Sequence, residues 1–202
     1  MAYRIIFVLL LFFLVSCSPI KINMESRDIS LFPVILNSDY PQELVNEEIQ
    51  ILKYTVKVLE RDLNVKIHIE NIYYTNVIIN VSCEYDIKKQ LKVDNDSDII
   101  VFFYNKTMCQ NVLGCAQLNG ILFRPTYIYV TMEGDLLQDT MALVHEIGHV
   151  LGAPHQNEGY IMNPYMNNIS ILEFSEDDKD AITVILKLFD QLNAKACLFY
   201  EK

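Results

Sequence analysis

Three of the four histidines in this chain of 202 residues lie close together, at positions 145, 149 and 155. Residues four apart share one face of a helix, so His145 and His149 can present two imidazoles to one ion. Because glycine readily takes positive φ, Gly152 can end that helix and turn the chain back to deliver His155. Three protein nitrogens leave a fourth tetrahedral position for water, as in a catalytic zinc site, and the neighbouring Glu146 can accept the proton of that water.

Two other interpretations of the cluster are weaker. A structural zinc site usually has four protein ligands with cysteine among them, and no cysteine lies between His145 and His155. Histidines that only pack against or cap a helix would not need the spacing of the whole pattern. The fourth histidine, His68, falls on the polar side of an alternating segment, and we expect it at the surface rather than in the site.

The complete pattern resembles the motif of the metzincin zinc peptidases, H-E-x-x-H-x-x-G-x-x-H followed by a methionine turn. Residues 160–164 are the candidate for that turn. The resemblance implies one zinc ion on the three histidines, with Glu146 as the catalytic base and Met162 as an apolar floor beneath the ligands. It also implies an α/β fold with a mixed twisted sheet, backing helices, an active-site helix and a small C-terminal subdomain.

Shorter segments of the sequence resemble particular branches of the metzincins. The body of the chain is similar to the catalytic domain of the reprolysin (adamalysin, ADAM-like) branch, and residues 151–155 and 159–162 are similar to tick salivary metalloproteases of that branch. Segments 161–164 and 174–178 also resemble matrixins. One position departs from the reprolysin pattern, because Gln156 stands where that branch has an aspartate directly after the third histidine.

The apolar spacing predicts the elements that must position these residues. Apolar residues at three- to five-residue steps predict a helix that ends near Asn64, and alternating or unbroken apolar runs predict strands. The expected strands are Ile29–Leu36, Val65–Ile69, Ile99–Tyr104 and Tyr127–Val130. Pro33 has no N–H to donate to a neighbouring strand, so we expect an edge or irregular strand there.

Two further helices complete the expected domain, which spans residues 29–202. The helix with the zinc ligands is predicted at about 138–152. A C-terminal helix is predicted at about 175–192, with Ser175 as N-cap, Asp178 in a capping-box role and an acidic first turn that suits the helix dipole.

The composition fits one folded domain and excludes one class of partner. Hydrophobic residues make up 51% of the chain, which rules out a largely disordered protein. The formal net charge is −10, and an acidic surface repels phosphate backbones, so we expect no nucleic acid partner. We expect the protein to act as a monomer.

The first residues have the pattern of an export signal. An uncharged apolar run from Ile5 to Val15 is too short to span a bilayer and suits the core of a signal peptide, so we predict a signal over residues 1–18 and a linker over 19–28. The segment that ends at Cys17 also resembles a lipobox, in which the cysteine is lipidated and anchors the protein. Either interpretation predicts a secreted or extracytoplasmic enzyme, with no room in the linker for a latency propeptide.

The other cysteines agree with that compartment. Four remain beyond Cys17, an even number that is expected for two disulfides. We favour the pairs Cys109–Cys115 and Cys83–Cys197, and free buried thiols are the alternative.

The function that follows is a zinc-dependent metalloendopeptidase acting on extracellular proteins. We expect the substrate to bind extended along a sheet edge near residues 113–118, with residues 163–165 forming a wall of the side-chain pocket. The alternative is a catalytically silent secreted binding module that keeps the fold. Retention of Glu146 argues against this alternative, because a silent module has no need of a base.

Overall fold

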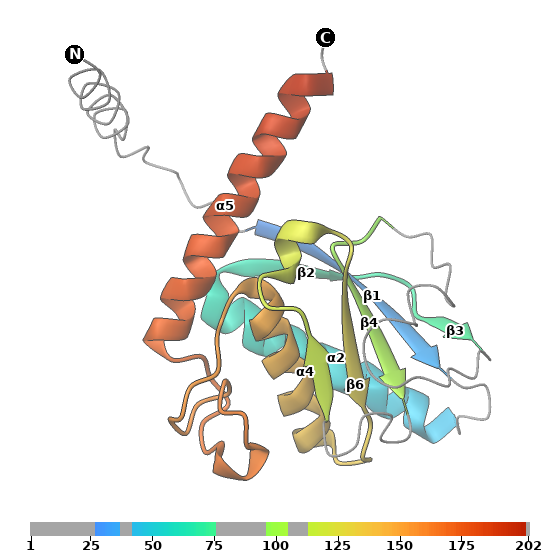
Figure 1. Cartoon of the computed structure of the whole chain (residues 1–202). Helices are drawn as coiled ribbons and strands as arrows, with labels where there is room; N and C mark the ends of the chain where they lie inside the picture. The colour runs from blue at the N-terminus through green and yellow to red at the C-terminus, as the bar shows by residue number, and fades with distance from the viewer. Residues whose placement is uncertain (1–26, 37–41, 76–95, 105–112, 201–202) are drawn as a thin grey trace, which may run out of the picture.

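The computed structural model describes residues 27–36, 42–75, 96–104 and 113–200. Its strands are β1 (Arg27–Leu36), β2 (Val65–Ile69), β3 (Tyr73–Thr75), β4 (Ile99–Tyr104), β5 (Gly114–Ala116) and β6 (Thr126–Thr131). Within the described residues they form one twisted sheet in the order β2-β1-β4-β6-β5, and β3 also pairs with β1 (Figure 1). All pairs are parallel except β5 with β6, which confirms the predicted α/β fold with a mixed sheet.

Strand β1 lies inside the sheet, so of the two alternatives predicted from Pro33, an edge or an irregular strand, the edge is wrong. It pairs with β4 on one side and with β2 and β3 on the other. The pairing with β2 ends at Leu31 and the pairing with β3 begins at Val34. Pro33 falls in the interval between these two partners, where a missing N–H removes no hydrogen bond to β2 or β3.

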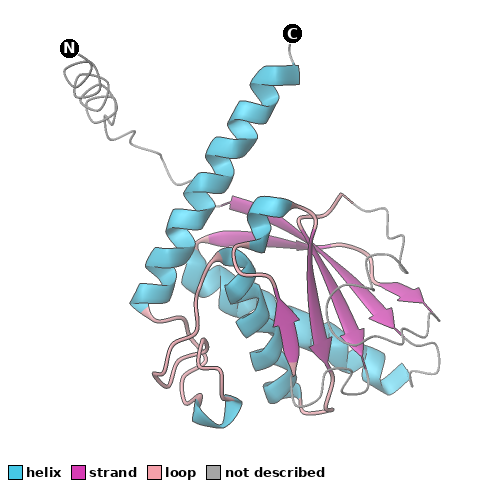
Figure 2. Cartoon of the chain, viewed as in Figure 1, coloured by secondary structure: helices cyan, strands magenta, loops and turns pink. Residues whose placement is uncertain are grey.

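Helices α2 (Gln42–Leu63) and α4 (Leu136–Leu151) cover one face of the sheet, as Figure 2 shows. The main core lies between this face and the helices, and it contains Ile51, Leu143 and Ile147 from the helices with Ile29 and Phe103 from the strands. A second apolar cluster lies on the opposite face. Because both faces are buried, the central strands appear in the sequence as unbroken apolar runs.

The second cluster is built around Phe102 of β4. Its ring stacks on Tyr127 and Tyr129 of β6, with centroids 6.0 Å and 5.3 Å apart, and Val34 and Ile100 are fully buried beside it. Buried side chains therefore lie on both faces of the sheet. At its edge, β6 pairs with β5, which lies next to α4.

After α4 the chain forms the expected small C-terminal subdomain, which contains the 3-10 turn η2 (Met166–Asn168) and the long helix α5 (Glu176–Tyr200). Another 3-10 turn, η1 (Gly120–Phe123), precedes β6. Helix α5 runs beyond residue 192, where the prediction ended it. Ser175 and Asp178 form the predicted capping box, since the Ser175 Oγ accepts from the Asp178 N–H and the Asp178 carboxylate accepts from the Ser175 N–H.

A cluster of charged and aromatic side chains joins α5 to β1. Arg27, at the start of β1, forms an ion pair with Asp190 of α5. The guanidinium groups of Arg27 and Arg124 lie 5.1 Å and 4.6 Å from the ring centre of Phe189. Residues 27 and 28, predicted as linker, therefore belong to the folded domain.

Some predictions concern residues outside this description. The signal region, Cys17, Cys83 and Cys109 lie there, so the lipid anchor and the disulfide pairs stay predictions. Across the described ranges, no helix combines the length and apolar character that crossing a membrane requires.

Candidate metal centre

Helix α4, which carries two of the histidines, begins at Leu136 because Asp135 caps it. The Asp135 carboxylate accepts hydrogen bonds from the N–H groups of Leu137 and Gln138, both at 3.0 Å. The predicted start near 138 is therefore two residues late. Asp139, part of the predicted start, is instead buried in the first turn and accepts hydrogen bonds from the backbone of the turn before the helix.

The helix ends as the sequence predicts. Gly152 has a φ of 110°, and its N–H bonds the carbonyls of Gly148 and His149. This left-handed residue reverses the chain, and three residues later His155 returns to the same side of α4. Alanine at Gly152 would be strained, since L side chains rarely adopt this backbone conformation.

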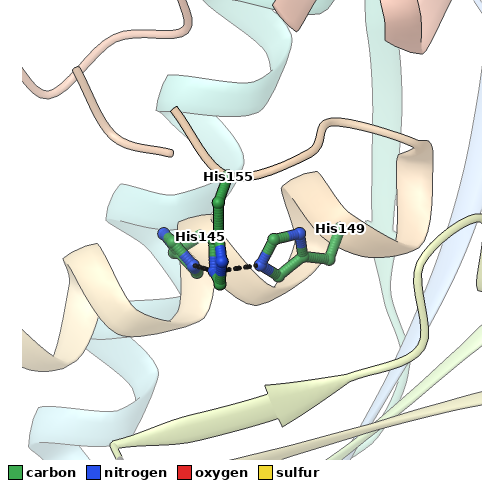
Figure 3. A group of neighbouring side chains, drawn as sticks. All are labelled: His145, His149 and His155. Carbon is green, nitrogen blue, oxygen red and sulfur yellow. Dashed lines mark hydrogen bonds between the residues drawn. The ribbon is translucent and has the colours of Figure 1, made fainter. Parts of the chain in front are cut away.

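The three histidine rings converge on one point (Figure 3). Nε2 of His155 lies 3.2 Å from Nε2 of His145 and 3.0 Å from Nε2 of His149. A tetrahedral zinc ion with Zn–N bonds of 2.0–2.1 Å holds its nitrogens about 3.3 Å apart, so the rings already have nearly the spacing that zinc requires. In the described part of the chain, no other group of histidine, cysteine or acidic side chains is close enough to hold an ion in this way.

Backbone carbonyls orient the two helical ligands. Nδ1 of His145 bonds the Ile161 carbonyl and Nδ1 of His149 bonds the Ala153 carbonyl, both at 2.8 Å. A carbonyl can only accept, so each Nδ1 carries the proton and each Nε2 presents a lone pair. Burial lowers the pKa of His145 to about 4 and lowers the pKa of His149, so both imidazoles are neutral at pH 7, the form that binds zinc.

The side chain of Glu146 extends from α4 to the edge strand β5. This side chain is buried, and the burial raises the pKa of the carboxyl to about 8. A Cβ added to Gly114 would meet Cγ and Oε1 of Glu146 at 2.6 Å, so the carboxyl rests directly against the bare backbone of β5. Without a nearby cation, a carboxyl with this pKa is mostly protonated at pH 7, and a cation held by the histidines would favour its ionised form.

The residue predicted as an apolar floor lies under the histidine-bearing helix. Met162 is fully buried, and a Cβ added to Gly148 of α4 would lie 2.5 Å from its sulfur and 2.8 Å from a ring carbon of Phe174. The same turn supplies the Ile161 carbonyl that orients His145. The glycine therefore lets the methionine turn approach the helix between its two ligands.

The segment after the third histidine shows a contact that the sequence reasoning missed. Gln156, which stood out only as a departure from the reprolysin pattern, donates from Nε2 to Oδ1 of Asp178 at 2.6 Å. Asp178 was predicted only as a helix cap. The signal in the sequence was an acidic residue at the start of an amphipathic helix, but nothing in the spacing identified its partner.

Three other residues that the sequence analysis considered have structural or surface positions. Asn163 is buried, where its side chain donates to the Glu158 carbonyl and accepts from the Tyr165 N–H, both at 2.9 Å, so it braces the turn. The Tyr165 side chain is exposed. His68 is exposed and near Asp28, at the surface as predicted.

Two solved structures share the fold at low sequence identity. Metalloproteinase-II from Bacteroides fragilis matches with a TM-score of 0.56 at 16% identity, over 80% of this chain and 53% of that chain, so this chain spans about half of its length. Archaemetzincin from Methanopyrus kandleri matches with a TM-score of 0.57 at 13% identity, over 82% of this chain and 98% of that chain. These matches show that the chain shares the fold of these two proteins. No curated protein matches the chain in sequence.

The family model of the matrixins matches residues 69–187. This span is more than half of the chain, and it includes the three histidines, Glu146 and the methionine turn. The chain therefore belongs to the matrixin family, and its three converging histidines fit zinc as the cofactor. The predicted metzincin character is confirmed at this level, while the reprolysin branch and the likeness to tick enzymes stay predictions.

Proposed function

We propose that this protein is a zinc-dependent metalloendopeptidase in which His145, His149 and His155 hold the metal and Glu146 is the catalytic base. The observation that supports it best is the convergence of three Nε2 atoms beside a buried carboxyl at a sheet edge. Three protein ligands leave one tetrahedral position open, as catalytic sites do.

A zinc ion on these imidazoles would polarise the scissile carbonyl and lower the pKa of a water molecule. Glu146 then accepts the proton of the attacking water and delivers it to the leaving amine, a role worth about 10²–10⁴-fold in rate. Because Glu146 is buried against Gly114, it keeps one orientation and loses little freedom when it acts.

The substrate class follows from the strand beside the base. β5 is antiparallel to β6, and no described strand pairs with its other side. An extended peptide can add to such an edge through main-chain hydrogen bonds, which read the backbone and not one particular side chain. This supports endopeptidase action on protein or peptide substrates.

The proposed setting is extracytoplasmic and rests on the sequence. The apolar run before residue 18 and the even number of further cysteines support export, with lipidation at Cys17 as the route to a membrane anchor. Placement in the reprolysin branch rests on the short segments that are similar to tick enzymes.

The test is cleavage of a mixed peptide library by the purified protein, read by mass spectrometry. We expect cleavage that is lost with a zinc chelator and restored by zinc. Glu146→Ala should bind zinc with unchanged stoichiometry and lose turnover. Hydrolysis unchanged in that variant would refute the assigned base, and zinc binding without any cleavage would favour the silent binding module.

A further inference from the structure

The third histidine lacks the support that the other two have. His145 and His149 are in a helix, and a carbonyl fixes Nδ1 of each ring. His155 is exposed and lies in an irregular segment. Among the described residues, its ring forms hydrogen bonds only with the other two histidines, and these cannot hold it while a metal occupies the three nitrogens. Something else must place this ligand.

The next residue in the chain is held at two points. The Gln156 N–H donates to the Met162 carbonyl at 3.0 Å, and its side-chain Nε2 donates to Oδ1 of Asp178 at 2.6 Å. The first bond ties the segment to the methionine turn and the second ties it to α5. A backbone fixed directly after His155 restricts where the histidine ring can reach.

Asp178 is built to be a fixed partner. It is fully buried, and its two oxygens have separate tasks: Oδ2 accepts from the N–H and Oγ of Ser175 at 3.0 Å and 2.7 Å, while Oδ1 accepts from Gln156. A buried carboxylate needs such donors, because ionised groups without them are costly to bury. The Ser175 N–H, which an alanine at this position would keep, therefore fixes the acceptor in the first turn of α5 before the metal arrives.

We propose that Gln156 and Asp178 are positioning residues that hold His155 ready for the metal, so that α5 sets the affinity of the site. The inference rests on the proposed function, in which His155 is a ligand. Partners beyond the ligands typically contribute about 10–100-fold to metal affinity, and a side chain acting through the backbone belongs to that class.

The test reverses the hydrogen bond. Gln156→Glu places two carboxylates face to face and should weaken zinc binding about 10–100-fold. The double variant Gln156→Glu with Asp178→Asn restores a donor and an acceptor, since the introduced amide can donate to the new carboxylate while its oxygen still accepts from Ser175. We expect its zinc affinity to return to within about threefold of the wild type, a rescue that a general loss of stability would not give.

Ser175→Ala is the matched control, because it removes a bond to the other oxygen of the same carboxylate. It should lower the melting temperature of the metal-free protein, as loss of a helix cap does, and leave the zinc affinity within about twofold. The measurement is zinc affinity by competition with a chromophoric chelator, together with metal-free melting for each variant of the full chain.

The outcomes separate this inference from the proposed function. If wild-type protein binds zinc, His155→Ala abolishes tight binding, and Gln156→Glu binds as the wild type does, the inference is wrong and the metal centre stands. Equal losses in Ser175→Ala and Gln156→Glu would also overturn it, since the whole helix end would then matter. If zinc binding does not depend on His155, the ligand set fails, and the inference fails with it.

Discussion

Two of the three converging histidines come from helix α4, and the third comes from the irregular segment that follows it. The helical pair is placed on one face of α4 by the helix period, a backbone carbonyl fixes each ring, and His145 is also buried. The third ligand depends on a turn at Gly152 and on contacts made by the residue beside it. One part of the site is thus fixed by local structure and the other by tertiary contacts, and the predictions below test that difference.

The largest effects are expected from removing ligands. His145→Ala and His155→Ala should each weaken zinc binding more than the roughly 100-fold that supporting residues give. They should differ without metal, because His145 is buried and its loss leaves the Ile161 carbonyl unpaired, at about 1–3 kcal/mol of unfolding free energy. His155 is exposed, and its loss should stay within about 0.5 kcal/mol. Chemical denaturation of the metal-free variants measures the two unfolding free energies. Equal losses in both variants would contradict the difference between the helical histidines and His155.

The next effect concerns the base. Gly114→Ala places a Cβ 2.6 Å from Glu146, so the carboxyl or β5 must shift. A displacement of about 1 Å in an active site can cost about 100-fold, and we expect a loss of this size in kcat/KM with zinc affinity retained. Ala116→Gly, the reverse exchange on the same strand, is the control and should keep activity within a few-fold. Full activity of Gly114→Ala would show that the Glu146 carboxyl does not need its position against β5 for catalysis.

A smaller effect tests the contact between helix α4 and the methionine turn. Gly148→Ala adds a Cβ 2.5 Å from the sulfur of Met162, and overpacking of this kind costs about 1–3 kcal/mol. Alanine also favours the helix by up to about 1 kcal/mol, so the expected net loss in unfolding free energy is about 1–2 kcal/mol. A more stable variant would mean that the methionine turn adapts freely to α4.

A last effect concerns the far end of α4 and depends on pH. Burial raises the pKa of Asp139 to about 6, so the folded state keeps its proton to higher pH than the unfolded state does. Wild-type stability should therefore fall as pH rises from about 4 to 6 on account of this group. Asp139→Asn removes that contribution, and its stability relative to wild type should improve by about 2–3 kcal/mol between about pH 4 and 7. A constant difference across this range, measured by urea denaturation, would contradict the shift.

The same division explains which features the sequence could predict. The spacing of the histidines, the glycine that ends α4 and the apolar runs of β4 and β6 are local, and each was recognised from neighbours a few residues apart. The capping box of Ser175 and Asp178 is local in the same sense.

The features that the sequence could not predict depend on distant partners. Pro33 was expected in an edge or irregular strand, and only the positions of β2 and β3 show why an inner strand tolerates it. Asp135 and Asp139 both suit a helix start, and burial of the second decides between them. The bond from Gln156 to Asp178 joins residues from opposite ends of an irregular segment, whose path no periodicity describes.

The contact of Arg27 with Asp190 and Phe189 has a consequence for how the domain is made. It joins β1, the first described strand, to α5, the last helix. Strand β1 pairs with three other strands of the sheet, β2, β3 and β4. During synthesis the N-terminal part emerges first, and β1 can pair with β2, β3 and β4 once residue 104 has been made. Its ion pair with α5 can form only when nearly the whole described chain is present. Such long-range closure slows folding and makes it cooperative. A nascent chain stopped before α5 would lack the helix that supports Gln156, so its affinity for the metal should reach the final value only with α5 in place.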